Sequence, residues 1–173
     1  MSGFLADNKN GWAVNLQKLK TLSQAWLEEG RQRLSMSMGI VSRIEGDLYE
    51  IVAVSSRTGV FVAGEVFPLM NTYCRAVYER KVTIALTEFD GVRGLRLHPL
   101  YETLPLEAYI SAPIFHESKV WGTFNFSCMA HRDQPFSDAD IRWVNGTSHQ
   151  ISEVLSGPDA SDASEAADAV TGP

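Results

Sequence analysis

The strongest constraint on the fold is the stretch from Glu107 to Cys128, EAYISAPIFHESKVWGTFNFSC. It holds two runs in which apolar residues alternate with others, joined by the polar residues 116–119. Alternation with a period of two is typical of a strand with one buried face, and two such runs with a short polar link predict an antiparallel hairpin. One face of the second run is apolar, and the other carries Trp121, Thr123, Asn125 and Ser127. Because a tryptophan beside polar side chains fits neither a dry core nor a solvated surface, we expect this second face to line a cavity.

A long helix is expected before the first strand. Large apolar residues recur close to helical spacing from Trp12 to Glu29, and Gly30 is expected to end the helix. These residues are Trp12, Leu16, Leu19, Leu22 and Trp26. Two interpretations of this stripe stay open: it packs on the core of its own chain, or part of it pairs with a second chain.

Further strands and a short helix are expected between this helix and the hairpin. Alternating or β-branched runs bounded by turn residues predict strands at Met36–Ile44, Leu48–Ser55, Val60–Phe67 and Val82–Leu86. A helix is expected at Thr72–Arg80 with Asn71 as its N-cap. The following segment, Thr87–Leu106, is irregular, and an irregular segment of this length inside a compact domain is usually functional or mobile.

The last helix has a clear start signal. Ser137 and Asp140 have the spacing of a capping box, and apolar residues then follow helical spacing to about Leu155. From 156 to 173 the composition changes to Ala, Asp, Ser, Gly and Pro, with four acidic residues and no basic one, which predicts disorder. We therefore expect a flexible N-terminus at 1–11, one domain at 12–155 and an acidic tail at 156–173.

This order of elements predicts an α+β fold. We expect one central antiparallel sheet with the long N- and C-terminal helices on one face. The short helix and Thr87–Leu106 are expected to roof a pocket on the other face.

Charge and composition argue against several classes of function. The net charge is −6, the isoelectric point is near 5.2, and Lys and Arg are scattered, so no nucleic-acid or membrane surface is expected. No apolar run is long enough to span a bilayer, and MSGFLADNKNGW lacks the features of a signal peptide. The two cysteines and four histidines show no metal-ligand spacing. Together these features favour a reduced, cytoplasmic setting.

The chain resembles the GAF domain family from about Met38 to Leu155. The residues that carry the resemblance are Gly64–Leu69, Thr72–Cys74, His98–Leu100, Tyr109–Ile114, Val120–Phe126 and Phe136–Ile141. The resemblance implies a sensory fold that binds small molecules such as cyclic nucleotides, tetrapyrroles or amino-acid-like ligands. It also implies regulation of histidine kinases, cyclases or transcription factors, often through helix-mediated dimers. Pro113, which would otherwise predict an edge strand or a bulge, is tolerated at this position in GAF-like strands.

Thiol chemistry finds little support in the sequence. Cys74 is expected in the first turn of its helix, where the helix dipole would lower its pKa, but a small packed apolar residue is the simpler interpretation. One GAF branch reduces free methionine sulfoxide with cysteines in the irregular segment, and Thr87–Leu106 contains none. The surroundings of Cys74 and Cys128 also do not match the bilin-attachment setting of phytochrome-type GAF domains. We therefore expect no enzymatic activity and assign no cofactor.

Ligand binding without chemistry is the remaining expectation. The candidate ligand-binding residues are Tyr73, Cys74, Asp90, Arg93, His98, Tyr109, Ser111, Thr123, Asn125 and Ser127. The leading hypothesis is a small-molecule sensor that forms a homodimer through its terminal helices and acts on a histidine kinase or cyclase. The alternatives are a dimerisation scaffold without a ligand and, third, a thiol-based redox enzyme or sensor.

Overall fold

The computed structural model describes residues 12–87 and 102–157, with side chains from Leu16 onward. A six-stranded antiparallel sheet has the strand order β3-β2-β1-β6-β5-β4. Its strands are β1 Met38–Glu45, β2 Leu48–Ser56, β3 Val66–Pro68, β4 Ile84–Thr87, β5 Ala108–His116 and β6 Lys119–Cys128. The helices are α1 Trp12–Arg33, the short 3-10 helix η1 Leu69–Asn71, α2 Arg75–Arg80 and α4 Asp138–Ser156. The α+β architecture expected from the sequence is confirmed.

The predicted hairpin is confirmed as β5 and β6. Its two linking residues, Glu117 and Ser118, have φ values of 48° and 64°, as in the tight turns whose twist matches that of the strands they join. The register shifts by one residue after Ile114, which pairs with Gly122 while Phe115 pairs with Val120. Trp121 is the extra residue of this bulge, and it packs in the core under the long helices. The expectation that Trp121 shares the cavity face with Thr123 is therefore wrong, because sequence alternation does not reveal a bulge.

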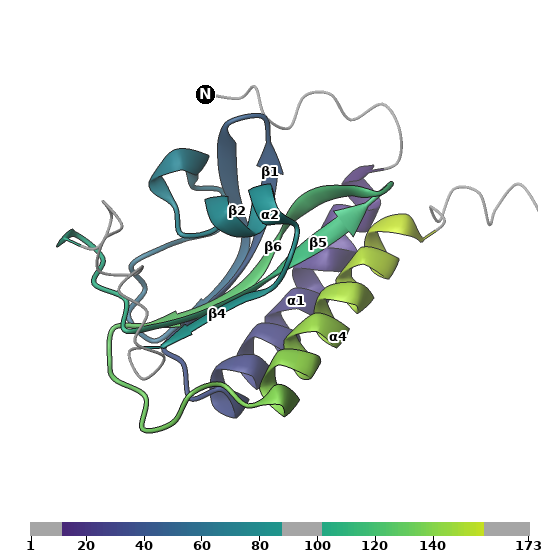
Figure 1. The fold of residues 1–173 in the computed structure, drawn as a ribbon. Coiled ribbons are helices and arrows are strands. Elements are labelled where there is room, and N and C mark those ends of the chain that lie inside the picture. The colour runs from purple at the N-terminus through teal and green to yellow at the C-terminus, as the bar shows by residue number, and fades with distance from the viewer. Residues whose placement is uncertain (1–11, 88–101, 158–173) are drawn as a thin grey trace, which may run out of the picture.

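The two long helices lie side by side on one face of the sheet (Figure 1). Their apolar stripes and the inner residues of β5 and β6 form one core, which includes the fully buried Leu19, Leu27, Phe124 and Phe126. The expected end of α1 at Gly30 is wrong, since the helix continues to Arg33. Gly30 is instead a contact point: a Cβ atom there would lie 2.1 Å from Phe126 Cζ. The glycine lets α1 approach the sheet.

The other sheet face carries η1 and α2 (Figure 1). A second core forms there from side chains of β1, β2, β5 and α2, among them Ile40, Ile51, Val77 and Tyr109. The expected helix Thr72–Arg80 is shorter, because α2 begins only after Cys74, and Asn71 is not its N-cap. Asn71 instead ends η1. The last of the four expected strands, Val82–Leu86, is observed as β4.

The third expected strand, Val60–Phe67, is also shorter than its sequence predicts. Only Val66–Pro68 pairs with β2, while Val60 and Val62 are exposed. The Glu65 carboxylate accepts a hydrogen bond from the backbone N–H of Val62 at 2.8 Å, which closes a turn just before β3. A turn with a left-handed Gly64 (φ 94°) replaces the start of the predicted strand.

The capping box at the start of α4 is confirmed. Ser137 Oγ accepts from the backbone N–H of Asp140 at 3.2 Å, and the Asp140 carboxylate accepts from the backbone N–H of Ser137 at 2.9 Å. The same helix explains Pro113, which lies two residues past the last β5 residue paired with β4. Its carbonyl oxygen accepts a hydrogen bond from Ser148 Oγ of α4 at 2.6 Å. Because β4 does not reach this position of β5, the N–H that proline lacks is not needed to pair with β4.

Candidate functional site

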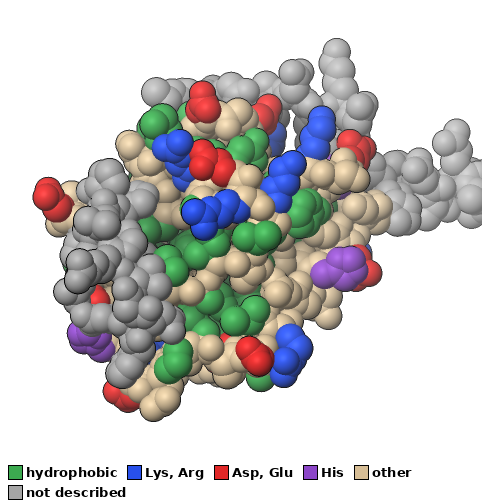
Figure 2. All heavy atoms as spheres, viewed as in Figure 1, with side chains coloured by type: hydrophobic (Ala, Val, Ile, Leu, Met, Phe, Trp, Pro, Cys, Tyr) green, Lys and Arg blue, Asp and Glu red, His purple; other side chains and the backbone are tan. Residues whose placement is uncertain are grey.

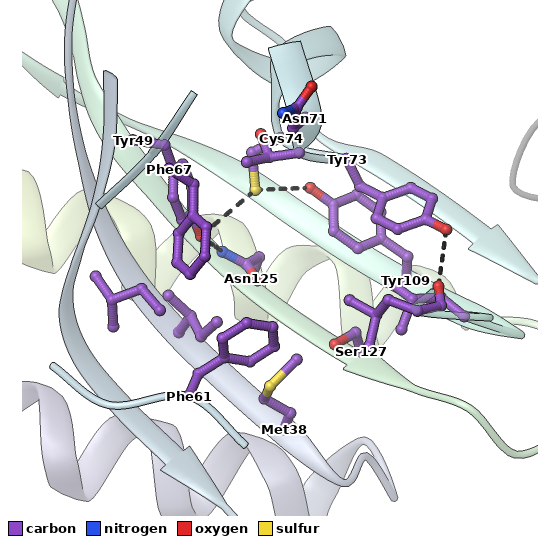
Figure 3. Close-up of a pocket in the computed structure, with 15 residues that line it drawn as sticks. Met38, Tyr49, Phe61, Phe67, Asn71, Tyr73, Cys74, Tyr109, Asn125 and Ser127 are labelled. Carbon is purple, nitrogen blue, oxygen red and sulfur yellow. Dashed lines mark hydrogen bonds between the residues drawn. The ribbon is translucent and has the colours of Figure 1, made fainter. Parts of the chain in front are cut away.

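A cavity of about 110 Å³ lies between the sheet and the η1–α2 segment (Figure 3). Its walls come from β1, β2, β5 and β6 below, and from the segments around residues 61–74 and 104–106 above. The side chains that line it are Met38, Ile40, Tyr49, Ile51, Phe61, Phe67, Asn71, Thr72, Tyr73, Cys74, Leu104, Leu106, Tyr109, Asn125 and Ser127. Apolar side chains also gather on this face of the molecule, with charged side chains around them (Figure 2).

The thiol of Cys74 is the centre of a buried polar cluster at one wall of this cavity. Tyr109 Oη donates to Cys74 Sγ at 3.1 Å, and Thr123 Oγ1 donates to it at 3.4 Å. The thiol lies 3.8 Å from Tyr49 Oη, to which it donates. Cys74 is placed there by the turn between η1 and α2, which points its side chain down onto the sheet (Figure 3).

Polar side chains on β6 and β1 extend this cluster. Asn125 Nδ2 donates to Tyr49 Oη at 3.3 Å and to Thr123 Oγ1 at 3.1 Å. Thr123 Oγ1 lies 2.7 Å from Ser42 Oγ of the neighbouring strand β1. Thr123 and Asn125 are two residues apart on one strand, so the alternation of side chains puts both on the cavity face. Hydrogen bonds thus link these buried polar groups to one another, as is usual for buried polar groups.

Burial sets the protonation state of this cluster. Desolvation raises the pKa of the Cys74 thiol, and its hydrogen bonds with Thr123, Tyr109, Tyr49 and Ser111 offset part of that rise. Burial also raises the pKa of Tyr49 and of Tyr109 well above the usual range, with repulsion from an ionised Cys74 as the second cause. All three groups are therefore neutral near pH 7. The helix dipole does not lower the pKa of Cys74, because α2 begins only after it and desolvation by the surrounding sheet dominates.

The sequence-based candidates fall into three groups. Tyr73, Cys74, Tyr109, Asn125 and Ser127 line the cavity.

The second group, Ser111 and Thr123, lies behind the side chains that line the cavity, and both residues are fully buried beside Cys74. Asp90, Arg93 and His98 lie outside the described residues. Tyr73 also contacts the upper wall, since its Oη donates to the Leu104 carbonyl at 3.0 Å.

Sequence reasoning missed the contribution of β1 and β2 to the site. Met38 and Ile40 of β1 and Tyr49 and Ile51 of β2 line the cavity. Both pairs are two residues apart, so period-two alternation assigns each pair to one sheet face. The alternation does not say which face, and only the pairing of β1 with β6 places them beside Asn125.

The described part of the chain offers little for metal chemistry. No group of three or more His, Cys, Asp or Glu side chains that could hold a metal ion occurs within residues 12–87 and 102–157. Within the same residues, no helix has the length and apolar character needed to cross a bilayer.

Comparisons with known proteins agree with this geometry. The chain is similar to the PixJ GAF domain of Thermosynechococcus elongatus, with 15% identity, a TM-score of 0.61 and coverage of 90% of this chain and 94% of that chain. It is also similar to the phycoerythrobilin-bound GAF domain of a cyanobacterial phytochrome, with 15% identity, a TM-score of 0.65 and coverage of 84% and 94%. A third similar structure is the type II free methionine-R-sulfoxide reductase of Thermoplasma acidophilum, with 10% identity, a TM-score of 0.62 and coverage of 82% and 94%. At these identities the likeness shows the fold.

A comparison with curated protein sequences gave no match. The model of the GAF domain family, in contrast, matches residues 17–156. This match includes α1 from residue 17 onward, all of α4, the whole sheet and every cavity-lining residue named above. The chain therefore belongs to the GAF domain family.

Proposed function

We propose that this domain is a non-enzymatic sensor that binds a small molecule in the cavity beneath η1 and α2. The observation that carries the proposal is a cavity with apolar walls and a few convergent polar groups, the usual composition of a small-molecule site. The likeness to a bilin-bound GAF domain supports the idea that a domain of this fold can hold a ligand. The cavity of about 110 Å³ is below the roughly 300–1,000 Å³ of drug-sized sites, so we expect a smaller ligand.

Output through the long helices is part of this proposal. The hairpin β5–β6 has the cavity on one face and α1 and α4 on the other, so a ligand that shifts Asn125 moves the strand that also carries Phe124. Phe124 contacts Trp143 of α4 with ring centroids 6.0 Å apart. A homodimer through the terminal helices would pass such a shift to a histidine kinase or cyclase.

The same observations give less support to two other functions, a thiol-based enzyme and a dimerisation scaffold. A thiol-based enzyme like the Thermoplasma reductase needs an ionised cysteine, whereas burial raises the pKa of both Cys74 and Cys128. A ligand-free dimerisation scaffold would have no use for a buried polar cluster beside an apolar cavity, although the exposed Leu22 on α1 is compatible with it.

Native mass spectrometry and thermal unfolding of the full chain test the proposal together. We expect a bound small molecule in freshly purified protein, or a rise in Tm when the low-molecular-weight fraction of a cell extract is added. A ligand at 100 times its Kd stabilises by about 2.7 kcal/mol, which is roughly 5–10 °C for a domain of this size.

A cavity-filling variant gives the matched control. Ser127→Leu adds carbon atoms to the cavity wall and is expected to abolish the bound mass and the Tm shift. Ser156→Leu makes the same change at an exposed position in the last turn of α4 and is expected to leave both unchanged. If the unmodified chain shows neither a bound mass nor a Tm shift, the sensor function is contradicted. The dimerisation scaffold then becomes the better supported function.

A further inference from the structure

We infer that the cavity selects an uncharged molecule with a small apolar body and one group that donates a hydrogen bond. This inference rests on the proposed sensor function and specifies the chemical class of its ligand. Alcohols, phenols and simple amides have such a group.

The first step of the argument is charge. None of the described side chains that line the cavity is Lys, Arg, His, Asp or Glu. The titratable lining groups Cys74, Tyr49 and Tyr109 are held neutral by burial. An ionised ligand would lose its hydration without gaining an opposite charge, and burial of an unpaired charge is strongly unfavourable. The described walls therefore favour a neutral ligand.

The second step is the hydrogen-bonding capacity left over in the polar cluster. Asn125 uses both Nδ2 protons, on Tyr49 Oη and on Thr123 Oγ1. Its carboxamide oxygen accepts no hydrogen bond from the described residues, and it lies on the side turned away from Tyr49 (Figure 3). Tyr49 Oη accepts from Asn125 and is also hydrogen-bonded with Cys74 and Ser42, so it has no free group to offer. One acceptor, the Asn125 carboxamide oxygen, thus remains at the cavity.

A ligand hydroxyl or amide matches this acceptor. Its proton can go to the Asn125 carboxamide oxygen. A hydrocarbon would leave this oxygen unpaired inside the protein, which is unfavourable. The cluster therefore discriminates a hydroxylated molecule from its hydrocarbon analogue.

The third step is size and shape. Rings surround the space: Phe61 and Phe67 pack edge to face at 5.7 Å, and Tyr73 and Tyr109 lie 5.9 Å apart. An apolar cavity of about 150 Å³ can hold a benzene molecule. The volume of about 110 Å³ is of the same order, so it suits a body no larger than a single small ring.

Calorimetric titration of the full chain at pH 7 tests these steps with four probes of similar size. Phenol has the inferred group, toluene lacks it, benzoate is an anion and benzylammonium is a cation. We expect phenol to bind at least tenfold more tightly than each of the other three, since tenfold corresponds to only about 1.4 kcal/mol.

Variants identify the groups responsible. Asn125→Leu removes the acceptor and is expected to reduce the preference for phenol over toluene roughly tenfold. Tyr49→Phe keeps the ring, its packing and the Asn125 oxygen, and is expected to retain the preference. Loss of the preference in Tyr49→Phe would show that the Asn125 oxygen is not the selecting group, even if Asn125→Leu does not fold. Asn145→Leu makes the same change at an exposed position of α4 and is expected to leave the preference unchanged.

The outcomes separate this inference from the proposed function. Benzoate or benzylammonium binding as tightly as phenol would overturn the inference while keeping a ligand cavity. The inference would also be overturned, and the sensor function kept, if no probe bound although native mass spectrometry showed a bound molecule. No bound molecule and no probe binding would overturn both.

Discussion

At Cys74 three tertiary contacts decide the chemistry of one side chain. Its thiol lies among Tyr49, Tyr109 and Thr123, which come from three different strands, and it is buried by them. The local sequence places a cysteine before a short helix, which favours a low pKa. The folded chain buries the same thiol, and this desolvation raises its pKa more than the surrounding hydrogen bonds lower it. We therefore assign Cys74 to packing in the wall of the proposed binding site.

The raised pKa predicts how stability depends on pH. Because the pKa of Cys74 is higher in the folded than in the unfolded chain, the unfolded chain loses this proton first as pH rises. The stabilisation is fully present below the ordinary thiol pKa of about 8.5 and is lost as pH rises toward the folded-state value. In a Cys128→Ser background, the free energy of unfolding is expected to fall by up to about 1.4 kcal/mol per pH unit for this one proton.

Urea unfolding between pH 7 and 10 measures this slope. Cys74→Ala in the same background is expected to flatten the curve from pH 8.5 upward, leaving the later contribution of the two tyrosines. It also lowers stability at every pH by a constant amount, because it removes the buried sulfur. Equal slopes with and without Cys74 would show that its pKa is not raised.

At the scale of elements, the close packing of α1 on the sheet depends on Gly30, which has no side chain. A Cβ at Gly30 would lie 2.1 Å from Phe126 Cζ and 2.8 Å from Trp143 Cη2. Phe126 is fully buried and cannot move aside without disturbing the core. The contact ties α1 to β6 and α4 at one point, on the face opposite to the cavity.

A pair of glycine substitutions tests this packing. Gly30→Ala is expected to destabilise the protein by about 1–3 kcal/mol through overpacking, in spite of the better helix propensity of alanine. Gly146→Ala in α4 meets no atom within 4 Å and is expected to stabilise by about 0.5–1 kcal/mol. Chemical denaturation of both variants gives the two values, and stabilisation by both would show that α1 does not pack closely on Phe126.

At the scale of the whole molecule, the sheet separates the long helices from the cavity. The long helices cover one face, and the cavity lies on the other (Figure 1). On the outward side of α1, Leu22 is 36% exposed, whereas Trp26 is partly buried and packs on the core. The expected pairing surface of this helix thus includes Leu22, and a charge at Trp26 would disturb the fold itself.

Homodimerisation is tested by sedimentation equilibrium over a range of protein concentrations. We expect the full chain to form a dimer, and Leu22→Glu to weaken it at least tenfold because a charge would be buried at the interface. Thr21→Glu, at a neighbouring exposed position of α1, is the control for added charge on the helix. A monomer at all concentrations, or equal effects of both variants, would contradict a dimer through this face of α1.

Much of the fold could be predicted from local patterns. Alternation predicted the hairpin β5–β6 and the pair β1–β2, and the capping box at Ser137 predicted the start of α4. The errors have two origins. At Gly30 the helix contacts Phe126, which is distant in sequence. The bulge at Trp121 and the turn that shortens β3 are local departures from regular alternation.

The sequence by itself determined the kinds of element, their order and the apolar faces that they bury. It did so because a strand that buries one face has apolar residues with a period of 2, and a helix that buries one face has them with a period of about 3.6. Only the tertiary structure decided which polar groups meet. Cys74 reaches Tyr49 and Thr123 across 25 and 49 residues of chain. Those contacts follow from strand register and from the docking of η1 and α2, which no local period encodes.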